Sequence, residues 1–209
     1  GLLGTHTKGR IAVAQDPQTS PVVVRGVVST LLRDLFDETI RPADISPTAL
    51  ASLRAKPAPD ASPVAADAAC LLESLANVVE IEHALTQPIP AAATAEALLD
   101  WYVQRGVHGL ELRLSQAFAR LESVGDAELL SRGETYLLNG PTCLQRRLRA
   151  FLDQIDNRLG DVIRPDPERF MHGPRSTLRL LKDTVYKQRQ RFDRIWILLF
   201  DGMRYDTWD

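Results

Sequence analysis

The sequence predicts a series of amphipathic helices that begin at serine-proline pairs. Ser20-Pro21, Ser46-Pro47 and Ser62-Pro63 each place a hydroxyl side chain before a proline at the first helical position. After the first and third pairs, apolar residues recur every three or four positions, which is the period of a helix with one buried face. The pairs therefore predict helices that end near residues 40, 55 and 87.

The same signals continue farther along the chain. Thr94 is expected to cap a helix that ends before Gly106, and Asp126 to cap a shorter one. The strongest apolar stripe runs over residues 144–162, and a last helix is expected after Gly173-Pro174. Together these segments predict a mainly α fold, with one multi-helix domain over residues 21–192. Residues 1–20 lack this period and are expected to form an extended arm, of which residues 10–14 could be a short edge strand.

An unbroken apolar run at residues 195–200 ends the helical pattern. It stops at Asp201-Gly202, as a strand buried on both faces does when it reaches a turn. In open α/β sheets, ligands bind beyond the carboxyl ends of the strands, so Asp201 would lie at the edge of a site. Arg204 and Asp206 follow closely and would add a guanidinium and a second carboxylate. This combination suits a divalent cation and a phosphate, and residues 193–209 are interpreted as the first strand of an incomplete α/β domain.

The run FDGMRYDTW, residues 200–208, resembles the opening of a PglZ domain. This module of the alkaline phosphatase superfamily occurs in the BREX phage-defence systems of bacteria, and its first strand ends in a similar D-G-L/M-R-Y-D run. The resemblance implies that Asp201 helps to bind a divalent metal, commonly zinc. It matches Arg204 and Asp206 to further motif positions without assigning them individual roles.

The sequence departs from the family pattern because it ends at Asp209. A site of that superfamily also needs a downstream Thr or Ser nucleophile and further Asp and His ligands, so we expect no complete catalytic site in this chain. The resemblance implies a metal-dependent phosphatase or phosphodiesterase in the full-length protein. The helical domain would then be a docking region for other BREX proteins or for the catalytic domain, inactive by itself.

A second interpretation is a stand-alone helical interaction module. Residues 1–140 carry 11 Lys and Arg against 17 Asp and Glu, whereas residues 141–194 carry 13 against 7. The basic excess predicts either a nucleic-acid or acidic-partner surface or an ordinary solvated helical face. The residues of this possible contact surface are Arg175, Arg179, Lys182, Lys187, Arg189 and Arg191.

Composition and motifs exclude several other classes. No apolar run approaches the ~20 residues that span a bilayer, and no signal peptide is recognisable, so a soluble, cytoplasmic protein without membrane contact is expected. Cys70 and Cys143 form no CxxC motif and are interpreted as buried free thiols. Neither GxxxxGK[ST] nor GxGxxG occurs, which leaves nucleotide binding by those loops unsupported. The sequence does not name a substrate, a partner or an oligomeric state.

Overall fold

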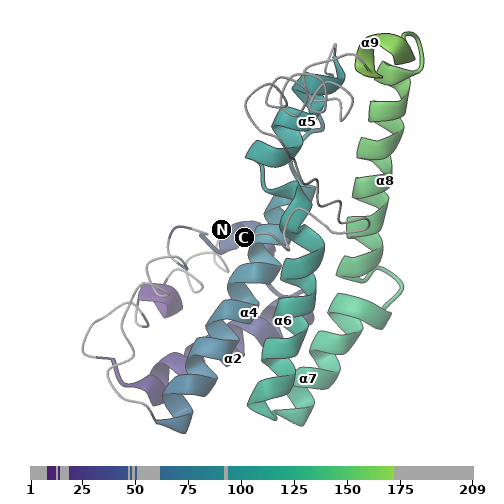
Figure 1. Cartoon of the computed structure of the whole chain (residues 1–209). Helices are drawn as coiled ribbons and strands as arrows, with labels where there is room; N and C mark the ends of the chain where they lie inside the picture. Colours follow the sequence, from purple (N-terminus) through teal and green to yellow (C-terminus); the bar gives the residue numbers. More distant parts are fainter. Residues whose placement is uncertain are drawn as a thin grey trace, which may run out of the picture. The chain divides into compact units, whose positions relative to one another are not determined.

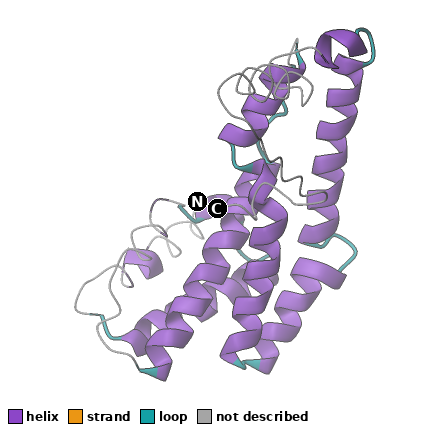
Figure 2. Cartoon of the chain, in the orientation of Figure 1, coloured by secondary structure: helices purple, strands orange, loops and turns teal. Residues whose placement is uncertain are grey.

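The computed structural model describes residues 9–12, 14, 19–46, 48, 50, 62–91 and 94–171. Within these ranges the residues form helices and connecting turns, and none lies in a β-strand (Figure 2). The prediction of a mainly α fold is therefore confirmed for this part of the chain. The strand expected at residues 195–200 lies outside it, together with the rest of the expected α/β segment.

The chain divides into two compact units. Unit 1 comprises Gly1–Gln87 and Leu110–Ala150, and unit 2 comprises Pro88–Gly109 and Phe151–Asp209. Each unit is thus built from two separate stretches of sequence. Helical periodicity indicates which residues are helical, but it does not indicate which helices share a core.

Unit 1 is organised around a closed bundle of four helices. They are α2 (Pro21–Phe36), α4 (Pro63–Leu85), α6 (Leu110–Val124) and α7 (Ala127–Glu134). α4 packs against α2 and α6, and α7 packs against the same two helices (Figure 1). The unit also holds a short 3₁₀ helix, η1 (Pro42–Asp44), a π-helical turn, η3 (Thr135–Asn139), and the first residues of α8 (Leu144–Ile163).

Helix α4 supplies the centre of the bundle. Leu75 and Val78 are fully buried on it, and burying an aliphatic side chain of this size stabilises a fold by roughly 1.5–3 kcal/mol. Ser74 is also fully buried, and its hydroxyl donates a 2.9 Å hydrogen bond to the Ala117 carbonyl of α6. The hydroxyl thus satisfies its hydrogen-bonding need where the two helices approach each other.

Most helix starts follow the capping signals of the sequence. The side-chain oxygens of Ser62, Thr94 and Asp126 each accept a hydrogen bond from the backbone N–H three residues later, at 3.1–3.2 Å. Ser20 makes no such bond, although α2 does begin at Pro21. Proline at the first helical position has a φ that already suits a helix and lacks one of the N–H groups that a cap would satisfy.

Helix α2 ends earlier than expected, at Phe36 in place of residue 40. Glu38 adopts a left-handed conformation with φ +56°, and the next amide, that of Thr39, donates to the Asp34 carbonyl at 2.8 Å. The Glu38 amide donates to the Leu35 carbonyl at 3.1 Å, which completes a Schellman motif. Glycine is the usual residue at this position, so its absence hid the helix end from sequence reasoning.

The N-terminal region also differs from the expected extended arm. Residues 9–12 and 14 are helical, and Ile11 and Ala14 are buried. Two buried positions three residues apart satisfy a helical period, but the segment is too short for that period to stand out in the sequence. Of the helix expected after Pro47, only residues 48 and 50 lie in the described part, and both are helical.

Unit 2 contains α5 (Ala95–Gln104), the 3₁₀ turn η2 (Val107–Gly109), the part of α8 that begins at Phe151, and α9 (Pro167–Met171). Gly106 follows α5 with φ +64°, as expected for a glycine after a helix end. The rings of Tyr102 and His108 lie 6.3 Å apart across this turn.

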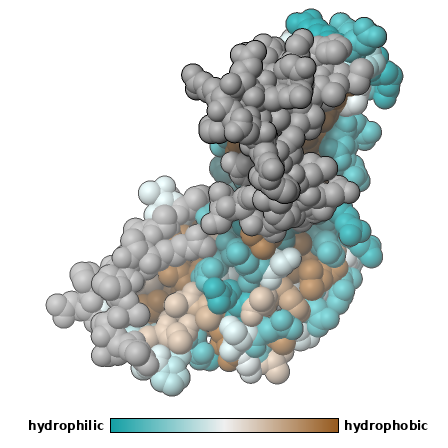
Figure 3. Space-filling view, in the orientation of Figure 1, coloured by the Kyte–Doolittle hydropathy of each residue, from teal (hydrophilic) through white to brown (hydrophobic). Residues whose placement is uncertain are grey.

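No helix in the described ranges is both long and apolar enough to cross a membrane. On the face seen in Figure 3, hydrophilic residues cover α8. Cys143 is a buried free thiol, as expected, whereas Cys70 is a free thiol that is only partly buried.

Candidate functional site

The residues that the sequence predicts to bind metal, phosphate or a partner all lie outside the described part of the chain. This applies to the expected metal and phosphate group, Asp201, Arg204 and Asp206, and to the basic contact surface of Arg175, Arg179, Lys182, Lys187, Arg189 and Arg191. Those predictions stay predictions. Among the described residues, no group of three or more His, Cys, Asp or Glu side chains is placed to hold a metal ion.

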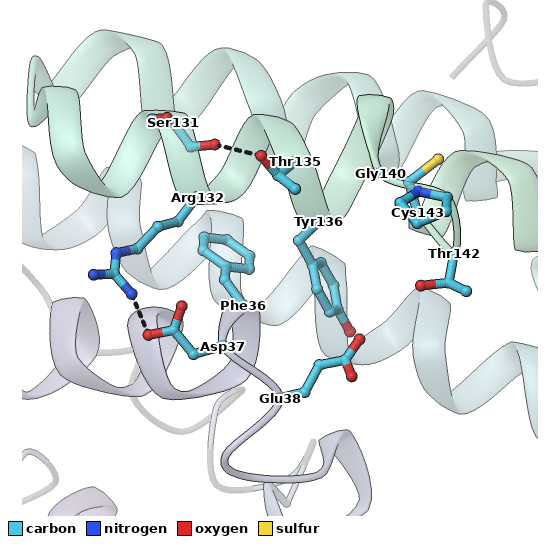
Figure 4. Close-up of a pocket in the computed structure, with 11 residues that line it drawn as sticks. Phe36, Asp37, Glu38, Ser131, Arg132, Thr135, Tyr136, Gly140, Thr142 and Cys143 are labelled. Atoms are coloured by element: carbon cyan, nitrogen blue, oxygen red, sulfur yellow. Dashed lines mark hydrogen bonds and ion pairs between the residues drawn. The ribbon is translucent and has the colours of Figure 1, made fainter.

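The described part of unit 1 contains a pocket of about 250 Å³, which we call the α2–π pocket (Figure 4). Three segments form it: the C-terminal end of α2, the last turns of α7 with the π turn, and the loop that precedes α8. Its lining residues are Phe36, Asp37, Glu38, Ser131, Arg132, Thr135, Tyr136, Gly140, Pro141, Thr142 and Cys143.

The π turn shapes one wall of this pocket. Its closing hydrogen bond runs from the Gly140 amide to the Thr135 carbonyl at 2.8 Å, a five-residue span. A Cβ on Gly140 would lie only 2.6 Å from that carbonyl oxygen, so a glycine is required where the turn closes. The Thr135 hydroxyl donates to the Ser131 carbonyl at 3.1 Å, which ties the turn to α7. Single π turns inside helical segments frequently occur at functional sites.

Two aromatic rings form the apolar side of the pocket. The ring centroids of Phe36 and Tyr136 lie 5.3 Å apart with a 40° angle between the ring planes (Figure 4). Phe36 is almost fully buried, and Tyr136 is half-buried. This tilted arrangement lies within the range that aromatic pairs prefer, and it joins α2 to the π turn.

Charged side chains lie beside the two rings in the lining of the pocket (Figure 4). Arg132 forms an ion pair with Asp37 of α2 and a second one, at 2.9 Å, with Glu128 of its own helix (Figure 4). The hydrogen bonds to Asp37 and Glu128 raise the pKa of Arg132. Glu38 is exposed, and its side chain has no hydrogen bond or ion pair within the described chain. The lining therefore carries two carboxylates and one guanidinium, and that guanidinium is already paired.

Glu38, which lines the pocket, adopts a left-handed backbone conformation with φ +56°. A residue with a Cβ pays about 1–2 kcal/mol to adopt this conformation, which glycine adopts freely. Such costs persist where the surrounding structure imposes them, and they cluster at functional sites.

A partly buried polar network connects Tyr136, which lines the pocket, to α4 and α8. Glu82 of α4 is almost fully buried, and Arg147 of α8 approaches it end-on, with Nη1 donating to Oε2 at 2.9 Å and Nη2 donating to Oε1. The Tyr136 hydroxyl also donates to Glu82 Oε1, and the Arg147 guanidinium lies 5.9 Å from the Tyr136 ring centroid. Both charges of the pair are thus neutralised and hydrogen-bonded, which a buried carboxylate requires.

The network changes the proton affinity of its members. Burial raises the pKa of Tyr136 well above its usual value, and the negative charge of Glu82 and the hydrogen bond to it raise that pKa further. Burial acts to lower the pKa of Arg147, but the hydrogen bonds and the charge of Glu82 outweigh burial and raise it. Tyr136 therefore remains a neutral hydrogen-bond donor at neutral pH.

Sequence reasoning missed these residues, although one signal was present. Glu82 falls in helical register with Leu71, Leu75 and Val78, so a carboxylate occupies a core position and must have a partner. Neither the identity of that partner, Arg147, nor the position of the pocket follows from the pattern. Comparisons of the chain with models of protein families, with curated proteins and with solved structures gave no match.

Proposed function

We propose that this chain is the helical docking region of a PglZ-like metal-dependent phosphatase or phosphodiesterase that serves a bacterial BREX phage-defence system. The observation that carries this proposal is the run FDGMRYDTW, which places an Asp-Gly turn directly after an apolar strand pattern and follows it with Arg204 and Asp206. The function of the helical part is then to hold partner proteins, or the catalytic domain, in position.

Under this proposal the chain supplies only part of a metal site. A catalytic zinc takes three protein ligands and leaves a fourth position for water or substrate. Asp201 and Asp206 offer at most two carboxylates, so the remaining ligands and the nucleophile would come from residues that follow in the longer protein. When bound, the metal supplies a Lewis acid that stabilises negative charge on the phosphoryl oxygens. Arg204 has the charge and geometry to bind phosphate oxygens.

The docking role is supported by the described helices. Unit 1 has its own core around α4, and its pocket is lined by side chains of mixed chemistry that the bundle holds in place. Aromatic and arginine side chains are enriched where one protein binds another, and this lining contains Phe36, Tyr136 and Arg132.

The test compares hydrolysis of a generic phosphomonoester and a generic phosphodiester by two proteins, with zinc or manganese added. One is this 209-residue chain, and the other is a version extended through the natural downstream sequence. We expect hydrolysis by the extended protein and none by the chain alone. Folded, metal-loaded extended protein that hydrolyses neither substrate would refute the enzymatic part of the proposal.

A stand-alone helical adaptor is the second candidate. The observation that favours it is that the α2–π pocket is lined wholly by residues between Phe36 and Cys143, so the pocket forms without any contribution from residues 193–209. A coding sequence that stops directly after Asp209 would place this candidate first.

A further inference from the structure

We infer that the α2–π pocket binds an arginine side chain presented by a partner polypeptide. The inference rests on the proposed docking function and specifies the chemistry of its recognition site. The pocket, at about 250 Å³, is smaller than the ~300–1,000 Å³ typical of sites for drug-sized ligands, so it suits one side chain.

Charge complementarity decides the sign of the occupant. Asp37 and Glu38 line the pocket, and Glu128 lies beside it in contact with Arg132. Arg132 is the cation of the lining, but it is shared between Asp37 and Glu128 and has no full charge left to offer an anion. Glu38 keeps an unpaired carboxylate within the described chain. Net negative charge would therefore repel an anionic group such as a phosphorylated side chain, whereas a cation would gain an ion pair with Glu38.

The aromatic side of the pocket selects among cations. The planar guanidinium stacks on aromatic rings and pairs with carboxylates in a bidentate manner, whereas the lysine ammonium is a compact and strongly hydrated point charge. Tyr136 already has one guanidinium, that of Arg147, near its ring within the fold. The half-buried Tyr136 ring and the exposed Glu38 carboxylate, which both line the pocket, thus offer the two kinds of contact that arginine uses (Figure 4).

The left-handed backbone of Glu38 allows a second test of its carboxylate, by substitution with glycine. A glycine would relieve the left-handed strain at φ +56°, yet this chain has a carboxylate there, at the edge of the pocket. If the carboxylate binds the partner's arginine, the glycine variant will be better folded and will bind less well.

The probe is N-acetyl-arginine-methylamide, titrated into the full 209-residue chain and followed by the NMR shifts of its backbone amides. Its neutral isostere, N-acetyl-citrulline-methylamide, and the lysine analogue are titrated in parallel. We expect saturable, millimolar binding of the arginine probe that moves the amides of Glu38, Tyr136 and Thr142, weaker binding of the lysine analogue, and no saturable shifts with citrulline.

Glu38→Gln is expected to weaken the arginine probe about threefold, the scale of one exposed charge pair. The matched control is Glu122→Gln on α6, an exposed glutamate that does not line the pocket and should bind like the natural chain. The inference would be overturned if the arginine and citrulline probes gave equal shifts, or if the shifts mapped to amides outside the pocket. It would also be overturned if the arginine probe showed no saturable binding, or if Glu38→Gln bound it with unchanged affinity. Any of these results leaves the hydrolysis test of the extended protein unaffected, so the two proposals fail separately.

Discussion

The Glu82 carboxylate and the Arg147 guanidinium form a two-point ion pair across 65 positions of sequence, with Nη1 2.9 Å from Oε2 and Nη2 bound to Oε1. The pair ties the buried face of α4 to the first turn of α8. Tyr136 donates to the same carboxylate, so the π turn is fixed at the same point. The wall of the α2–π pocket therefore depends on a polar contact to the almost fully buried Glu82.

Removal of one partner of this pair should be costly. Arg147→Met leaves Glu82 buried without its counter-charge. We expect the free energy of unfolding to fall by about 2–3 kcal/mol. This is less than the full cost of breaking a buried pair, because Arg147 is partly exposed. Urea denaturation followed by circular dichroism measures the change. The neighbouring exposed Arg146→Met is the control and should change stability by less than about 0.5 kcal/mol. Equal effects of the two substitutions would show that the pair does not stabilise the fold.

Tyr136 should make stability depend on alkaline pH. Its pKa is raised in the folded chain by burial and by Glu82, so the folded state holds the phenol proton more tightly than the unfolded state does. The resulting stability is fully present below the unfolded pKa of about 10 and is lost as pH rises from there toward the folded pKa.

Tyr136→Phe removes this dependence together with the hydrogen bond to Glu82. The stability difference between the natural chain and the variant should therefore shrink by about 1 kcal/mol between about pH 8 and about pH 11. Urea titrations of both proteins at the two pH values measure it. A difference that stays constant would contradict the raised pKa.

Gly133 lets α7 approach its neighbours. A Cβ there would lie 2.7 Å from Leu121 Cδ1 and 3.2 Å from Phe36 Cε2. Gly133→Ala should destabilise the chain by about 1 kcal/mol, because the cost of overpacking exceeds the gain in helix propensity. Gly26→Ala is the matched control on α2, where a Cβ meets nothing within 4 Å, and it should stabilise the chain by about 1 kcal/mol. If both substitutions shift the melting temperature in the same direction, α7 does not pack as closely against Leu121 and Phe36 as described.

Glu38→Gly should raise stability and lower binding together. Glycine relieves the left-handed strain in the folded chain, but it also gives the unfolded chain more conformational freedom. The net effect is expected to add about 0.5–1 kcal/mol to the free energy of unfolding. The same variant should bind the arginine probe less tightly than the natural chain. If the variant gains stability and keeps its full affinity for the arginine probe, the Glu38 carboxylate does not bind the arginine.

The elements that sequence reasoning located carry local signals. The cap at Asp126, the glycine at position 106 and the apolar stripe that begins at Leu144 each act within a few residues, so their consequences can be read in order along the chain. The end of α2 escaped because Glu38 replaces the usual glycine.

The pocket escaped for a different reason. Its lining combines the end of α2 with residues about a hundred positions later, and the π turn that shapes it has no composition of its own. Sequence periodicity contains no information on such pairings, because it describes the buried face of each helix and not the helix that covers it. Asn139-Gly140-Pro141 contains helix-breaking residues, but such a run does not specify a π turn.

Zinc-dependent hydrolysis of a small phosphoester by the protein extended beyond Asp209 is measured for three forms: natural, Asp201→Ala and Glu122→Gln. Asp201 is proposed to hold the metal, whereas Glu122 is an exposed glutamate outside both the proposed metal group and the α2–π pocket. We predict that Asp201→Ala abolishes hydrolysis and that Glu122→Gln leaves it unchanged. Hydrolysis that survives Asp201→Ala would refute the proposed metal role of Asp201.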